Sequence, residues 1–136
     1  MDTQELIERA KAFMRAVASM APAHEIEAFY APDVVQEEFP NRLLPNGALR
    51  DLAALREAGE KGRKVMSAQT IEIVNAVGSG ECVVLEAIWT GTLAIAMGNL
   101  KLRSDQGALC AGLRVQGRPH LAAAQLRLLL SLVTRL

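Results

Sequence analysis

The chain has 136 residues, of which 51% are hydrophobic, and its formal net charge at pH 7 is zero. This length suits one domain with its own core, and the composition is typical of a globular protein. No apolar run reaches the roughly 20 residues that a membrane-spanning helix needs, and the basic residues do not cluster with aromatic ones. We therefore expect neither a membrane nor a nucleic acid as a partner. With only two cysteines, a cytoplasmic protein without disulfides is expected.

The N-terminal segment has the spacing of two helices. Asp2 followed by Glu5 is a capping pattern at the start of a helix. Apolar residues then recur every three or four positions over residues 6–20, which predicts one buried helix face. Pro22 ends this helix, and a shorter helix is predicted over residues 23–30.

A short strand and a third helix are predicted next. Residues 34–39 are predicted as a strand, in which Glu37 and Glu38 would face opposite sides. One of these two carboxylates therefore turns inward, whichever face is buried. The Asn-Gly pair at 46–47 is expected to cap a third helix, with Leu49 on its inner side.

Two long strands joined by glycines form the centre of the predicted fold. Residues 67–77 and 81–96 are rich in Val, Ile, Leu and Thr, and the sequence Gly-Ser-Gly at 78–80 separates them. This pattern predicts an antiparallel hairpin. With the preceding helices covering one of its faces, the predicted fold class is α+β.

The last 36 residues differ in character from the rest. Residues 101–136 contain six Lys and Arg against a single acid, Asp105, and no aromatic residue. Residues 107–117 include three glycines and show no clean period, and residues 121–136 would form a basic, apolar helix. We therefore divide the chain into an α+β segment, 1–100, and an atypical Leu/Ala/Gly-rich tail of the same domain, 101–136.

The motifs FYAPDVV, EEFPN and WTGTLA, in this order of elements, carry a resemblance to a known family. Residues 1–100 resemble the SnoaL-like proteins of the nuclear transport factor 2-like (ketosteroid isomerase-like) superfamily. The resemblance implies helices packed in the concavity of a curved, mainly antiparallel, cone-like sheet around an apolar pocket, and many relatives are homodimers. It also implies two final strands, which residues 101–136 do not match. The chain is therefore expected to lack the last two strands of the sheet.

A change of reading frame would explain this mismatch. A permitted choice of codons for residues 108–129, read one base later, encodes a strand, an Asp-Gly turn and a second strand. The alternatives are a genuine divergent tail that forms a surface or dimer-contacting helix, and a basic helix on anionic lipid. The coding nucleotide sequence distinguishes these hypotheses.

Glu38 is the candidate catalytic residue. Ketosteroid isomerase-like enzymes use a carboxylate in an apolar pocket as a general base. Within the motif DVVQEEFPN, Glu38 resembles that carboxylate in position, although the family typically has Asp there. The alternative interpretation is a solvated strand residue beside Glu37.

Four further residues are candidates for a ligand pocket, each with a structural alternative. Tyr30 could donate a phenol hydrogen bond or pack in the core, and Phe39 could line the pocket or belong to the core. Asn41 could orient a ligand or bond the turn backbone, and Trp89 could form a pocket wall or pack in the sheet. Isolated histidines and distant cysteines do not make a metal site, so no metal and no cofactor are expected.

The predicted function is binding of a small apolar or polyketide-like ligand, with isomerase- or cyclase-type acid–base chemistry in relatives. The alternatives are a non-catalytic ligand-binding or dimerisation module, and an inactive product of a frameshifted gene. Whether the chain is an enzyme stays open at this point.

Overall fold

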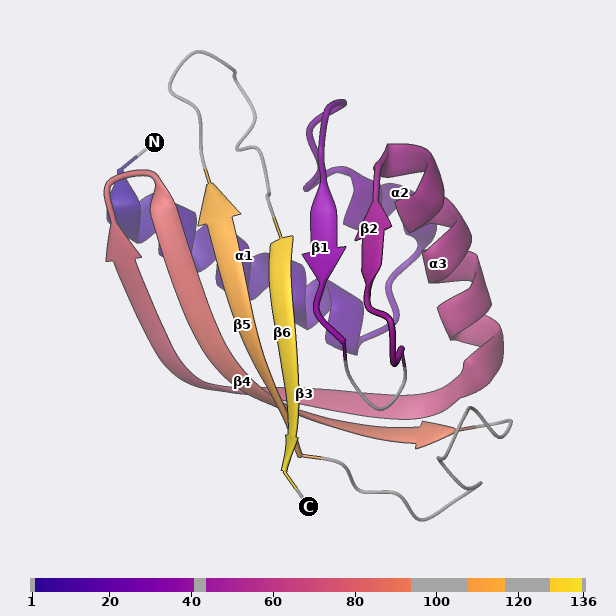
Figure 1. Cartoon of the computed structure of the whole chain (residues 1–136). Coiled ribbons are helices and arrows are strands. Elements are labelled where there is room, and N and C mark those ends of the chain that lie inside the picture. Colours follow the sequence, from indigo (N-terminus) through magenta and orange to yellow (C-terminus); the bar gives the residue numbers. More distant parts are fainter. Residues whose placement is uncertain (1, 41–43, 94–107, 117–127, 136) are drawn as a thin grey trace.

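The computed structural model describes residues 2–40, 44–93, 108–116 and 128–135, and these form helices packed on one curved sheet (Figure 1). The helices are α1 (Thr3–Ala18), α2 (Ala23–Glu27) and α3 (Leu52–Val65). The strands are β1 (Gln36–Glu38), β2 (Ala48–Arg50), β3 (Met66–Ser79), β4 (Cys82–Leu93), β5 (Ala108–Gln116) and β6 (Leu128–Arg135). Their order in the sheet is β2-β1-β6-β5-β4-β3, with β1 and β6 parallel and the other neighbours antiparallel. The predicted α+β class is confirmed.

Helix α1 begins with the predicted capping box and is anchored to the β3–β4 turn. The Asp2 carboxylate accepts a hydrogen bond from the Glu5 backbone N–H, and the Glu5 side chain accepts one from the Asp2 N–H. The Thr3 hydroxyl donates to the Gly80 carbonyl at 2.9 Å. A Cβ at Gly78 would meet the Thr3 side chain, so this glycine lets the helix approach the sheet closely.

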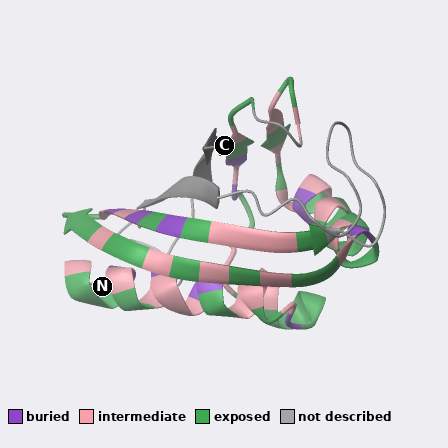
Figure 2. Cartoon of the chain, turned by 90° about the horizontal axis from the view of Figure 1, so that it is seen from below, coloured by how far each residue is buried: buried purple, intermediate pink, exposed green. Residues whose placement is uncertain are grey.

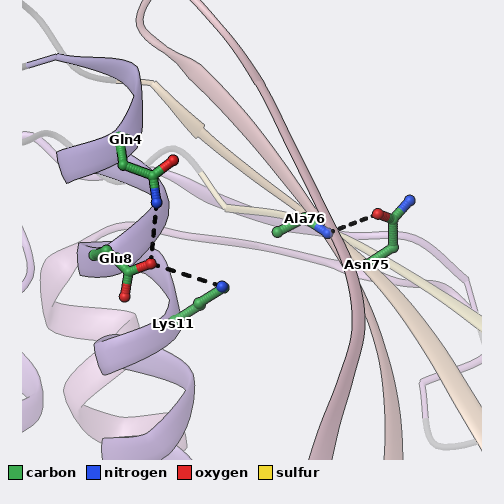
Figure 3. Close-up of polar contacts among 5 residues, drawn as sticks. All are labelled: Gln4, Glu8, Lys11, Asn75 and Ala76. Carbon is green, nitrogen blue, oxygen red and sulfur yellow. Dashed lines mark hydrogen bonds and ion pairs between the residues drawn. The ribbon is translucent and has the colours of Figure 1, made fainter.

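The core lies between α1 and the hairpin of β3 and β4. In Figure 2, α1 runs alongside this pair of strands. Leu6 and Phe13 of the helix are buried against Val83 and Leu85 of β4. Full burial of one such aliphatic side chain stabilises a fold by about 1.5–3 kcal/mol. On its polar side α1 carries Glu8, which accepts from Gln4 and pairs with Lys11, as its amphipathic spacing predicts (Figure 3).

Two β-bulges bend the long hairpin, whose strands curve strongly in Figure 1. The second one leaves Val74 without a partner between the pairs formed by Ile73 and Asn75. This extra residue shifts the inward–outward alternation of side chains along β3 by one position. As a result, Ile73 before it and Ala76 after it both pack against the core. The Asn75 side-chain oxygen accepts a hydrogen bond from the Ala76 N–H at 3.0 Å within this irregular segment (Figure 3).

The expectation that the chain lacks the last two strands is wrong. β5 pairs along β4, and β6 lies between β5 and β1, so the Trp89 strand is not an edge of the sheet. A period of two in residues 108–116 was overlooked because glycines at 107, 112 and 117 obscure it. Three of its apolar positions pair with buried residues of β4: Ala111 with Ala87, Leu113 with Leu85, and Val115 with Val83. Leu109 pairs with the half-buried Trp89. The frameshift hypothesis stays a prediction about the coding sequence.

The third helix begins later than predicted. The Asn-Gly pair at 46–47 lies in the turn between β1 and β2, where Gly47 has a φ of +66°. Asp51 caps the helix instead, its carboxylate accepting from the Ala54 N–H at 2.8 Å. Leu49, expected on the inner side of a helix, is an exposed residue of β2. The Gly47 N–H donates to the Leu44 carbonyl at 2.9 Å, so residues 44–47 form a turn, and glycine tolerates the positive φ at its end.

Candidate functional site

Strand β1 turns Glu38, and not Glu37, toward the inside. Gln36 is 8% exposed and the Glu38 side chain is 13% exposed, whereas Glu37 between them is exposed. Val34, two residues before Gln36, is also buried. The alternation of a strand therefore carries one amide and one carboxylate to the buried side. A polar side chain in this position requires a partner.

Arg50 of β2 supplies that partner. In the antiparallel pairing of β1 with β2, Arg50 lies opposite Gln36. Its Nη1 donates to Gln36 Oε1 at 2.9 Å and lies 3.8 Å from Glu38 Oε1. The second distance makes an ion pair and is too long for a hydrogen bond. The Arg50 side chain is 17% exposed, so solvent screens this pair less than a surface pair.

Tyr30 lies close enough to Arg50 for the guanidinium charge to affect the pKa of its phenol. The phenol ring packs edge-on to Phe13 with their centroids 5.6 Å apart. Burial and the nearby Glu27 carboxylate raise the pKa of Tyr30 to about 12, and the Arg50 charge opposes this rise. The phenol is therefore protonated at physiological pH and can donate a hydrogen bond. Glu27 itself is held by Arg56, whose Nε lies 2.8 Å from its carboxylate.

We call Tyr30, Gln36, Glu38 and Arg50 the polar cluster. Its members come from the segment after α2 and from the β1–β2 hairpin. It combines a carboxylate that can accept a proton with a guanidinium and a phenol that can donate hydrogen bonds. This set of groups can bind an oxygen-bearing ligand or move a proton.

Trp89, a predicted pocket residue, lies on β4 in a separate polar contact. Its indole Nε1 donates to Gln69 Oε1 at 2.9 Å, and Gln69 Nε2 donates to the Val17 carbonyl at 2.6 Å. A Cβ at Gly91 would meet the Trp89 ring, so the indole lies over this glycine. The structure thus gives the indole a fixed orientation, and no described hydrogen bond joins it to the polar cluster.

Two other predicted pocket residues are not brought into the polar cluster. Phe39 is 40% exposed, so the alternative that placed it in the core is wrong. Its position directly after the inward-facing Glu38 turns it to the other side of the chain. Asn41 lies outside the described residues.

Sequence reasoning missed Arg50 because it assigned residues 48–50 to a helix. Without Arg50 as a partner, it did not single out Gln36 either.

The described residues contain neither a metal-binding cluster nor a membrane-spanning helix. No group of three or more His, Cys, Asp and Glu side chains in them could hold a metal ion. None of the helices described is long and apolar enough to span a membrane.

The match to a known family covers most of the chain. The SnoaL-like domain family matches residues 10–118, and the chain belongs to this family. The matched segment extends beyond residue 100 and takes in β5. No curated protein sequence matches the chain.

Several solved structures share the fold. AclR of Streptomyces galilaeus, a proposed hydroxylase, has a TM-score of 0.67 at 14% identity, covering 86% of this chain and 73% of AclR. A proposed ketosteroid isomerase of Kribbella flavida DSM 17836 has a TM-score of 0.62 at 10% identity, covering 98% and 82%. A nuclear transport factor 2-like protein of Burkholderia xenovorans LB400 has a TM-score of 0.59 at 18% identity, covering 96% and 88%. At these identities the likeness shows the fold alone.

Proposed function

We propose that the helices and the curved sheet enclose a cone-shaped pocket for a small, largely apolar molecule, and that Glu38 is its general base. The observation that carries this proposal is the inward position of the Glu38 carboxylate beside the Arg50 guanidinium. The family and the fold of the proposed ketosteroid isomerase from Kribbella flavida support it.

The chemistry would be proton abstraction next to a carbonyl group. Glu38 would take the proton, and the negative charge that develops on the carbonyl oxygen needs a donor. Tyr30 offers a protonated phenol for this role, since its pKa is raised to about 12. Because the Tyr30 phenol keeps its own proton at physiological pH, it does not compete with Glu38 for the proton taken from the ligand.

A non-catalytic binding module is the second candidate function. The ion pair between Glu38 and Arg50 favours it, because a carboxylate held by a guanidinium can orient the β1–β2 hairpin without exchanging a proton. Both functions use the same pocket, and they differ in whether Glu38 exchanges a proton with the ligand.

Hydrogen exchange and binding measured on one ligand separate these functions. A β,γ-unsaturated ketosteroid is incubated with the protein in deuterated water, and its isomerisation and deuterium uptake are followed. As a general base, Glu38 is required for uptake, so Glu38→Gln abolishes it while calorimetric binding of the ketone is kept. Glu37→Gln, which changes the exposed neighbour, is the matched control. Binding without uptake by the wild type supports the second function, and no binding contradicts the proposed pocket.

We also propose a homodimer, as the resemblance implies. Val74, Val77 and Ile88 are large hydrophobic residues exposed on the neighbouring strands β3 and β4. Burial of such residues against a second copy would remove them from water. Sedimentation velocity should show a dimer that Val77→Glu dissociates, and a monomeric wild type at high protein concentration would contradict this proposal.

A further inference from the structure

Arg50 uses one side of its guanidinium for contacts within the chain. Among the described residues, its hydrogen bond to Gln36 and its ion pair with Glu38 both run through Nη1. No hydrogen bond or ion pair of its Nε or Nη2 is found among the described residues, and the Arg50 side chain is 17% exposed. A guanidinium presents Nε–H and Nη2–H as a fork that fits the two oxygens of a carboxylate.

We propose that Arg50 binds an acidic oxygen group of the ligand through Nε and Nη2. This inference rests on the proposed pocket and names its ligand class: an apolar ring system that carries a carboxylate or a comparably acidic enol. Gln36 and Glu38 hold the opposite side of the guanidinium and so orient the fork.

The charges around Arg50 agree with a singly charged anionic group. Glu38 is the acidic partner of Arg50 at 3.8 Å, and it occupies the Nη1 side. The ligand oxygens would meet the guanidinium on its other edge, which keeps the two carboxylates apart. Tyr30 lies near Arg50 and adds a hydrogen-bond donor there. The phenol is uncharged at neutral pH, because its pKa is raised to about 12.

Two probes of equal shape test this role in the wild type. 2-Naphthoate carries a carboxylate and 2-naphthamide a neutral amide on the same ring, and calorimetry at neutral pH gives the dissociation constant of each. We expect naphthoate to bind about tenfold more tightly or better, because hydrogen bonds to charged groups are strong. Equal affinities, or tighter binding of naphthamide, would overturn the role of Arg50 and leave the pocket in place.

Variants then assign the preference to Arg50. Arg50→Gln should lose the preference for naphthoate and keep its affinity for naphthamide, and Arg50→Lys should restore part of the preference through its charge. Arg56→Gln is the matched control, since Arg56 pairs with Glu27 on the surface, and its preference should equal that of the wild type. Glu38→Gln should tighten naphthoate binding, because it removes the competing carboxylate.

The outcomes distinguish a failure of the role of Arg50 from a failure of the proposed pocket. If Arg50→Gln weakens both probes equally while thermal melting shows a folded chain, Arg50 is structural and the inference is wrong. If naphthamide binds the wild type and naphthoate does not, the pocket stands and the anionic ligand class is wrong. If neither probe binds the wild type, both the pocket and the role of Arg50 are contradicted.

Discussion

The indole N–H of Trp89 on β4 donates a hydrogen bond to the side-chain oxygen of Gln69 on β3, at 2.9 Å. Gln69 in turn donates to the Val17 carbonyl near the end of α1, at 2.6 Å. One side chain thus ties the sheet to the helix and fixes the orientation of the indole. Both bonds are part-buried, so their loss leaves groups that water satisfies only in part.

Gln69→Leu is expected to lower the free energy of unfolding by about 1–3 kcal/mol, because it leaves a donor and an acceptor without their partner. Trp89 is the single tryptophan of the chain, so urea unfolding can be followed by its fluorescence. Gln4→Leu is the control, since it removes an exposed bond to Glu8 and should change stability by less than about 0.5 kcal/mol. If the two variants are equally stable, the Gln69 bonds do not tie the helix to the sheet.

Gly91→Ala is expected to destabilise the fold by about 1–3 kcal/mol, because the added methyl group meets the Trp89 ring and the end of Met66. The emission maximum of Trp89 should shift as the ring moves. Gly59→Ala in α3 has open space around the new methyl group and should stabilise the helix by about 0.5–1 kcal/mol. A Gly91→Ala chain with wild-type stability and emission would show that the indole does not lie over this glycine.

Tyr30 is the single tyrosine of the chain, so the absorbance of tyrosinate reports on it alone. The folded protein should titrate with a pKa of about 12, against about 10 for the urea-unfolded chain. Between these values the folded chain keeps a proton that the unfolded chain has lost, so this group's stabilisation, complete below pH 10, falls as the pH rises. The loss amounts to about 2–3 kcal/mol and should be absent from Tyr30→Phe. A folded midpoint near 10 would show that the phenol is solvated.

The helices and the central hairpin could be predicted because local chemistry determines them. The capping box at Asp2 and the apolar spacing after it specify α1 without help from the rest of the chain. The glycine turn specifies the hairpin in the same way, with Gly80 at a φ of +57°. Strand β5 was missed because its alternation is interrupted by small residues, and its pairing with β4 is a long-range contact.

The candidate site was predicted only in part, for one physical reason. Glu38 was found through its motif, but which face of β1 is buried depends on the neighbouring strand. Asn46-Gly47 is a strong hairpin signal as well as a possible helix cap. A two-residue turn at this pair would place residue 43 opposite Arg50, whereas the longer connection over residues 39–47 places Gln36 there, and the sequence does not specify that register.

Ligand-induced amide shifts test the central claim most directly. The spectrum of the ¹⁵N-labelled protein is assigned and titrated with 2-naphthamide, the neutral probe that does not depend on Arg50. We predict that the largest shifts fall on the amides of the polar cluster, Tyr30, Gln36, Glu38 and Arg50, and that Glu38→Gln still binds the probe. Shifts confined to the exposed residues Val74 and Val77, or no shifts at saturating probe, would contradict a ligand site at Glu38.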